Sequence, residues 1–337
     1  MKRCCLSFWI LFTAWSVDTD AAPVPAFSLP VLTSAADVIA IGAIGAVDDR
    51  GPSAVPTPSG TLPGRAMVAE LRVDRLLKGQ LATNRLTVRF AIPDKPNGYR
   101  TLSPNSYRLV FLRQTADGFE FASPFHPSTV AVPGGVFDGE TPEDRVIAAT
   151  AQVLSAPASS SAKTEAIFAL WGLKRASAID GLRAALQEVD QAVRLSAAAA
   201  LLAAGDMTSW GIAEAALREP TKAEDAQLVH NLRVGIAQGV RAPAAIPRLA
   251  QLLGIGDVGT RRAIASALAE IDSAAAVSPL SRALDDLDFE VRLSAVRGLA
   301  RISGQRALSP SWDAFQANEA RFVSPLKAWV LKNFGVQ

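Results

Sequence analysis

A pattern of apolar and polar positions recurs through the C-terminal half of this 337-residue chain. Counted from Asp288, apolar or small residues fall at offsets 3, 7, 10 and 11, and an arginine falls at offset 4. Asp257 and Asp190 begin similar copies, and Asp225 and Ser159 begin weaker ones, so that successive copies lie 31, 32, 35 and 31 residues apart. These offsets share one side of a helix, and aspartate suits a helix N-cap. The pattern therefore predicts one amphipathic helix per copy in a helical solenoid.

A second helix precedes three of the copies, because a shared apolar pattern stands before each. Pro247 and Pro279 fall in the first turns of these helices, where a missing N–H costs little. A pair of short helices cannot bury its apolar face alone, so neighbouring pairs must stack. The first helices are expected at 178–186, 245–253 and 276–284, an initial cap at 142–156, a closing helix at 321–334, and the whole solenoid at 142–337.

The best copies read Asp-Phe-Glu-Val-Arg-Leu-Ser-Ala-Val-Arg-Gly-Leu at 288–299 and Asp-Gln-Ala-Val-Arg-Leu-Ser-Ala-Ala-Ala-Ala-Leu at 190–201. These runs resemble HEAT repeats, in particular the short alanine-rich bacterial type related to those of phycobilisome lyases. The resemblance implies an α-solenoid that serves as a binding scaffold for a protein partner. It names no partner, since this repeat occurs in proteins of many functions.

Residues 30–138 show the two-residue alternation of β-strands instead. Between the first two expected strands, residues 48–64 are rich in proline, serine and glycine and are expected to form a long mobile loop. The chain should therefore be α+β with two domains, a small antiparallel β-barrel followed by the solenoid. Strands are expected at 38–47, 68–74, 86–90, 107–112 and 119–121.

Segments 36–42, 76–79 and 106–112 resemble parts of the OB-like barrels of the TIMP/netrin type that occur in exported bacterial proteins. Animal relatives of that fold inhibit metalloproteases through an N-terminal cysteine, which is missing here. Barrels of this type also bind oligosaccharides and oligonucleotides. No basic, aromatic-lined strand favours nucleic acid in this chain, and its net charge is only +2.

The N-terminus reads as a secretory signal peptide, assigned to residues 1–21. Lys2 and Arg3 precede an apolar run at 6–15, and small residues allow cleavage after Ser16 or Ala21. The run is short for a membrane span, although an uncleaved anchor is the alternative. We therefore expect an exported bacterial protein, either periplasmic or extracellular.

Cysteine and histidine are too scarce for several kinds of site. Cys4 and Cys5 are the only cysteines and precede the apolar run, so the mature protein would contain neither disulfides nor thiolate metal sites. The two histidines, His126 and His230, belong to different expected domains. No nucleophile elbow, phosphate loop or dinucleotide fingerprint occurs. We predict no catalytic residues, no cofactor and no metal site.

A partner is expected to bind along the concave side of the solenoid. Offsets 5 and 9 of each copy point away from the apolar stripe, so their side chains should form the floor of a groove that is apolar at one end and basic at the other. The alternative is an ordinary solvated helix surface. The repeated arginines Arg194, Arg261 and Arg292 are instead expected to bond across to neighbouring repeats. The predicted groove floor consists of Leu195, His230, Val234, Arg262, Leu293 and Arg297.

These patterns favour an exported, non-enzymatic binding protein that recruits a protein partner in the solenoid groove. One alternative is an enzyme-like role, in which the solenoid handles a tetrapyrrole as bilin lyases do. The signal peptide argues against it, because that chemistry is cytoplasmic. Another alternative is a carbohydrate- or envelope-binding module that acts through the barrel. The sequence leaves the oligomeric state open.

Overall fold

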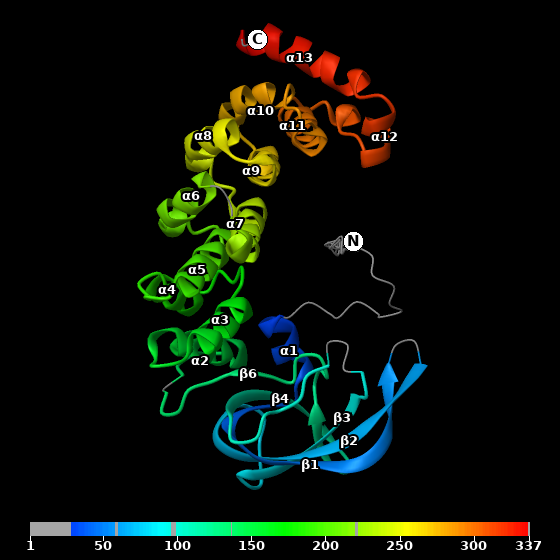
Figure 1. Cartoon of the computed structure of the whole chain (residues 1–337), viewed down its shortest axis with the longest axis vertical. Coiled ribbons are helices and arrows are strands. Elements are labelled where there is room, and N and C mark those ends of the chain that lie inside the picture. Colours follow the sequence, from blue (N-terminus) through cyan, green and yellow to red (C-terminus); the bar gives the residue numbers. More distant parts are fainter. Residues whose placement is uncertain (1–27, 58–59, 96–98, 136, 220–221, 336–337) are drawn as a thin grey trace.

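The computed structural model describes residues 28–57, 60–95, 99–135, 137–219 and 222–335. It consists of a β-sheet in the N-terminal part and a curved row of helices in the rest (Figure 1). A short helix, α1 (Leu29–Ala35), contacts both parts, through β4 of the sheet and α2 of the helical row. The predicted signal peptide lies outside the described residues.

Within the described residues, the sheet has six strands, and their pairings form a cycle. The pairings pass from β1 through β2, β3, β5 and β4 and return to β1, while β6 adds to β4. All pairs are antiparallel except β3 with β5. All five segments predicted as strands fall within observed strands. The strands are β1 (Val38–Thr57), β2 (Gly60–Lys78), β3 (Arg85–Pro93), β4 (Tyr107–Thr115), β5 (Gly118–Phe121) and β6 (Ser128–Val130).

The expectation of a long mobile loop at 48–64 is wrong, because most of this segment belongs to the end of the β1–β2 hairpin. Pairing extends as far as Thr57 opposite Gly60. Proline is excluded from central strands because it lacks a donor, but strand edges tolerate it. This end of the hairpin lies beyond the last β2–β3 pair, Gly64 with Pro93. Composition alone could not distinguish an edge hairpin from a loop.

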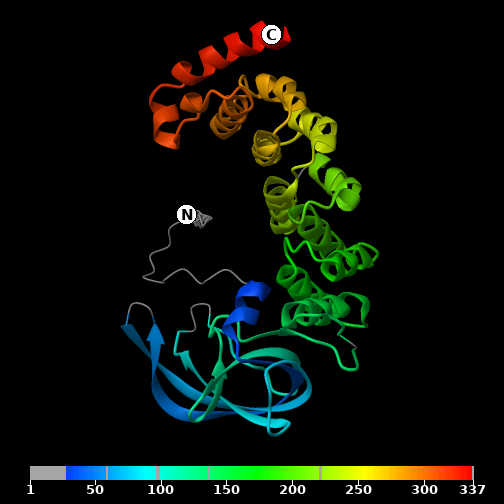
Figure 2. The same cartoon turned by 180° about the vertical axis from the view of Figure 1, so that it is seen from behind.

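Helices make up the rest of the chain, in the pairs that the repeat predicts. In both views, α7, α9 and α11 lie on the inner side of the curve, and α6, α8 and α10 lie on the outer side (Figures 1 and 2). None of the helices in the described part combines the length and apolar character that a membrane crossing requires. The helices are α2 (Pro142–Ser155), α3 (Ser160–Ala169), α4 (Ala176–Ala185), α5 (Gln191–Ala203), α6 (Trp210–Arg218), α7 (Ala226–Gly239), α8 (Ile246–Ile255), α9 (Val258–Glu270), α10 (Val277–Ala283), α11 (Phe289–Ile302), α12 (Trp312–Ala317) and α13 (Ala320–Phe334).

The predicted start of each second helix is confirmed. Asp190, Asp257 and Asp288 are N-caps whose carboxylates accept backbone N–H groups of the first turn, and Ser159 does the same with its hydroxyl. These bonds satisfy donors that a helix end otherwise leaves unpaired. Asp225, which begins a weaker copy, also stands at the N-cap but makes no such bond.

One apolar core joins the sheet to the first helices. Leu29 of α1, Phe111 of β4 and Ile147 of α2 belong to a single cluster of buried side chains, which continues as far as Leu201 of α5. A second cluster begins on the other side of α5, at Leu195, and extends into α13. The division between these two cores therefore lies within α5, well inside the predicted solenoid.

Polar contacts reinforce the junction between sheet and helices. Arg108 of β4 donates two hydrogen bonds to Glu165 of α3, with N–O distances of 3.2 and 2.5 Å. Glu165 also accepts the backbone N–H of Val130 in β6 at 2.9 Å. Arg145 of α2 donates twice to the carbonyl of Leu77 at the end of β2. Because these bonds are partly buried, they fix the orientation of the sheet against α2 and α3.

Candidate functional site

The groove floor predicted from the repeat is only partly exposed. Leu195 and Leu293 are buried, with 5% and 3% of their surface accessible. The prediction that they face solvent is wrong, because each second helix packs against the second helices of its neighbours as well as against its own partner. The approach is close: a Cβ added to Gly235 in α7 would lie 2.3 Å from the carbonyl oxygen of Ala199 in α5. Leu195 and Leu293 both belong to the apolar core that the neighbouring helices share, so offset 5 contributes to this second contact.

The other four predicted residues remain at least partly accessible. His230 is exposed and Val234 is half-buried on α7. The charge of Arg262, however, is already neutralised: its guanidinium pairs with Asp288 at 2.6 Å and with Glu290 at 2.8 Å. Arg297 donates to the carbonyl of Pro310. The structure thus leaves less free positive charge on this surface than the sequence suggests, and whether a partner binds there stays a prediction.

Ion pairs of this kind connect successive repeats. Arg233 of α7 pairs with the N-cap Asp257 at 2.5 Å, just as Arg262 of α9 pairs with the N-cap Asp288. The hydrogen bond from Arg262 is the main reason that the pKa of Asp288 lies below its ordinary value. The aspartates that cap the helices therefore also hold the preceding repeat in place.

The expectation that the arginines at offset 4 bond across to neighbouring repeats holds for Arg261 and Arg292 but not for Arg194. Arg194, Arg261 and Arg292 each donate to backbone carbonyls of the turn that precedes their own helix. Arg261 also pairs with Asp286 of the next repeat, and Arg292 pairs with Glu319. Arg194 bonds within its own repeat.

The turns between first and second helices expose aliphatic side chains along one edge of the solenoid. Val189 and Leu287 each immediately precede an N-cap aspartate, and both are 95% exposed. Ile255, two residues before another N-cap, is 58% exposed. Arg194 donates to the carbonyl of Val189, and Arg292 donates to that of Leu287. The backbone is thus fixed at positions where an apolar side chain stands in solvent. We call these three residues the turn edge.

A cavity of about 480 Å³ lies between two turns of this edge, bordered by Ile255 and Leu287. Three of its charges are matched, since Arg261 pairs with Asp286 and Asp285 pairs with a lysine of α13. Arg282 also lines the cavity, and its side chain makes no hydrogen bond or ion pair with any residue that the structure describes. The cavity therefore combines apolar walls with one unmatched positive charge.

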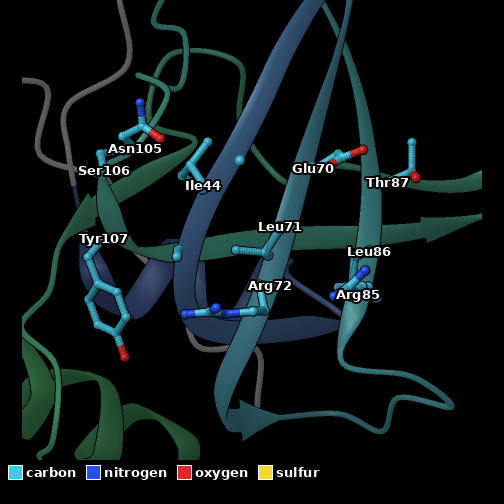
Figure 3. Close-up of a pocket in the computed structure, with 12 residues that line it drawn as sticks. Ile44, Glu70, Leu71, Arg72, Arg85, Leu86, Thr87, Asn105, Ser106 and Tyr107 are labelled. Atoms are coloured by element: carbon cyan, nitrogen blue, oxygen red, sulfur yellow. The ribbon is translucent and has the colours of Figure 1, made fainter.

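A larger cavity, of about 640 Å³, lies on the sheet (Figure 3). Four of its lining residues lie side by side on adjacent strands. Tyr107 of β4 is paired with Ala43 of β1, Ala43 is paired with Arg72 of β2, and Arg72 is paired with Arg85 of β3. Glu70 lines the cavity two residues before Arg72. Sequence reasoning missed this site, since it depends on strand register rather than on any motif.

The side chain of Tyr107, which lines this cavity, is partly buried. Burial raises the pKa of its hydroxyl, and the nearby carboxylate of Asp74 adds to the effect. A hydrogen bond to that carboxylate contributes to the shift, so the hydroxyl already has an acceptor in Asp74. Within the described segments, no cluster of three or more histidine, cysteine, aspartate or glutamate side chains has an arrangement suited to a metal ion.

Comparison with known proteins finds a family match in the helical part. The family of HEAT repeats matches residues 212–300 and, in an overlapping match, 246–323. This part of the helical row is therefore similar to HEAT repeats. A solved designed armadillo repeat protein, YIII(Dq)4CqI, aligns with 56% of this chain and 93% of its own length, at 17% identity and a TM-score of 0.33. A likeness at that level carries no argument about function. No curated protein matches the chain.

Proposed function

We propose that this protein is an exported, non-enzymatic binding protein whose solenoid holds a protein partner. A HEAT-type repeat array is typical of protein–protein scaffolds, because stacked helix pairs present a long continuous surface. The observation that carries the proposal is the turn edge, where Val189 and Leu287 are 95% exposed on turns that arginines hold in place. Exposed apolar side chains on a rigid backbone suit a docking surface.

The turn edge suits this role better than the inner face of the solenoid. Two of the apolar residues expected on the inner face, Leu195 and Leu293, are buried, and Arg262 already has two acidic partners. The cavity beside Leu287 instead offers space, apolar walls and the unmatched Arg282. We infer that the partner inserts an aliphatic side chain between Ile255 and Leu287 and places an acidic group near Arg282.

The test is capture of a partner from the envelope fraction of the exporting cell with the purified full-length protein as bait. Ile255→Asp combined with Leu287→Asp should abolish capture of the protein that the wild type retains, with the melting temperature nearly unchanged. Arg282→Glu should weaken capture by itself. Leu62→Asp is a matched control, since Leu62 is an exposed leucine, 39% accessible, on β2 of the sheet and not on the solenoid.

The same experiment can also show that the partner binds a different surface of the solenoid. If the edge variant captures normally and Arg297→Glu does not, the partner binds the inner face and the edge assignment is wrong. If the wild type captures nothing that survives a competing wash with unlabelled protein, the scaffold function itself is wrong.

Export is a separate part of the proposal, and Lys2, Arg3 and the apolar run at 6–15 support it. The N-terminal sequence of the mature protein from the periplasm or medium should begin at Val17 or Ala22. A soluble cytoplasmic protein that retains Met1 would contradict export and would return the tetrapyrrole alternative to consideration. Visible absorbance of the purified protein would then test that alternative directly.

We also propose that the sheet is an OB-type barrel. The cyclic order of the pairings, with β1 joined to both β2 and β4 and with β3 parallel to β5, supports this assignment. If the sheet is closed, backbone amides of β1 at 38–43 should exchange slowly with solvent, because β1 has a neighbour on each side there. Rapid exchange along that stretch would argue for an open sheet.

A further inference from the structure

We propose that the cavity on the sheet is a binding site for a small organic ligand that carries a carboxylate or phosphate group together with hydroxyl or amine donors. This site is independent of the partner surface on the solenoid. Four observations carry the proposal: an arginine pair in register, the space beside it, a free carboxylate at the other end, and the hydrogen-bonding groups between them.

The first observation is a pair of like charges directly opposite each other. Arg72 of β2 faces Arg85 of β3 in the register of the antiparallel pair. Such a pair destabilises a sheet unless a counter-charge lies nearby. Arg72 has only a long contact to Asp74, at 3.7 Å, and the Arg85 side chain has no hydrogen bond or ion pair among the described residues. The two side chains do not point at each other, since Arg72 extends toward Tyr107 and Arg85 stays at β3 (Figure 3). An anion bound in the cavity would supply a counter-charge to Arg85 and a closer one than Asp74 to Arg72.

The second observation is the space beside the arginines. Ala43 and Gly45 of β1 present almost no side chain, so the surface between Tyr107 and the two arginines is hollow. In Figure 3, the Arg72 side chain extends across β1 toward Tyr107. The cavity volume of about 640 Å³ falls within the range of small-molecule sites. Guanidinium groups bind carboxylate and phosphate oxygens in pairs, which suits an anion at this end.

The third observation limits the kind of anion. Glu70 lines the other end of the cavity, next to Gly45, and its carboxylate has no hydrogen bond or ion pair with a described residue. This carboxylate would repel a polyanion such as a nucleic-acid backbone. It would instead accept a hydrogen bond from a hydroxyl or ammonium group of the ligand. Charge alone therefore favours a ligand with an anionic end and a donor end.

The fourth observation is the set of polar groups between the two ends. Thr87 stands opposite Glu70 in the β2–β3 pair, and Asn105 precedes β4 with a left-handed backbone, at φ 59°. Both line the cavity, as does Tyr107, whose hydroxyl is hydrogen-bonded to Asp74. These groups can donate and accept hydrogen bonds along a polar ligand, so that orientation does not depend on charge alone.

The test measures the melting temperature of the full-length protein in a buffer of low ionic strength. The probes are inorganic phosphate, glycerol 3-phosphate and gluconate, with sodium chloride at equal ionic strength as the reference. We expect a saturable rise in melting temperature, larger for gluconate or glycerol 3-phosphate than for phosphate. The better of these two ligands also distinguishes a carboxylate site from a phosphate site.

Variants separate a ligand site from a structural role. Arg85→Gln should raise the melting temperature without ligand, because it removes the like-charge pair, and it should abolish the rise caused by the probes. Glu70→Gln should keep the response to phosphate and reduce the advantage of the hydroxylated probes. Arg89→Gln is the matched control, since Arg89 is exposed four residues further along β3 and does not line the cavity.

Three outcomes would overturn the proposal: no saturable rise with any of the probes, a loss of response in Arg89→Gln equal to that in Arg85→Gln, or a lower melting temperature of Arg85→Gln without ligand. The last result would mean that Arg85 stabilises the fold. Partner capture by Arg85→Gln should equal that of the wild type, so this test and the test of the scaffold function can fail separately.

Discussion

The two ends of the helical row are joined to their neighbours in different ways. At the sheet end, α1, α2 and α3 share an apolar core with the sheet, and a partly buried pair, Arg108 with Glu165, binds across the junction. Toward the C-terminus, repeats meet through close contacts at small residues such as Gly298, which lies against Ala269 of α9, and through half-exposed pairs such as Arg262 with Asp288. The first junction joins helices to a sheet, whereas the second recurs with the repeat.

This difference predicts where the molecule comes apart. Repeats that contact only their neighbours lose structure from a free end, whereas helices that share a core with another unit unfold together with it. Because the sheet-side core extends to Leu201 in α5, α2–α5 should behave as part of the sheet unit. The helices from α6 onward should instead lose structure progressively from the C-terminal end, because each repeat there contacts only its neighbours.

The largest expected effect tests this division directly. Leu268→Ala removes a fully buried side chain from the C-terminal core and should lower the free energy of unfolding by about 2–5 kcal/mol. Limited proteolysis of the variant should leave a stable fragment that ends near Ala203, the last residue of α5. A fragment that ends near residue 140 would show that the shared core does not hold α2–α5 to the sheet. Leu201→Ala, the equivalent change on the sheet side, should render the sheet itself susceptible to the protease.

A smaller effect distinguishes the polar contacts at the two junctions. Arg108→Ala should lower the free energy of unfolding by about 1.5–3 kcal/mol, because it leaves Glu165 partly buried without its charged partner. Arg262→Ala should lower it by less than about 1 kcal/mol, since that guanidinium is 43% exposed and its ion pairs are screened by water. Urea unfolding measures both. Equal losses would contradict the distinction between a buried and a surface junction.

The smallest effect depends on pH. The hydrogen bond from Arg262 holds the pKa of Asp288 below its ordinary value, so this contribution to stability is present above the ordinary pKa and is lost as pH falls through the folded-state value. Asp288→Asn keeps an N-cap side chain but removes the charge. It should therefore cost less than about 1 kcal/mol at pH 7, and the difference from wild type should vanish in acid, once the pH lies below the folded-state pKa of Asp288. A difference that persists at low pH would assign the effect to capping instead of charge.

Much of the helical part could be predicted from the sequence, because a repeat is a local signal. Asp190, Asp257 and Asp288 mark helix starts, and the spacing of apolar residues marks one buried face. A period shows only that one face is buried, however. It could not reveal that Leu195 and Leu293 contact neighbouring second helices, since that contact depends on how closely the helices approach. The turn edge was visible in principle, as apolar residues immediately before two N-caps.

The sheet was harder to predict because its contacts are not local. Alternation located the strands, but strand register determines which residues meet, and alternation leaves register open. The pairing of Arg72 with Arg85 therefore appears only in three dimensions. For the same reason no sequence pattern indicated that Glu165, deep in the helical part, bonds to β4 and β6.

The proline-containing end of the β1–β2 hairpin has a consequence for solubility. Pro52 and Pro63 lie in the part of the hairpin that extends beyond β3. A two-stranded ribbon with free backbone donors could recruit the same ribbon from another molecule, and such edge-to-edge pairing leads to aggregation. Proline lacks the donor that this pairing requires, so these residues should oppose edge-to-edge pairing of the ribbon.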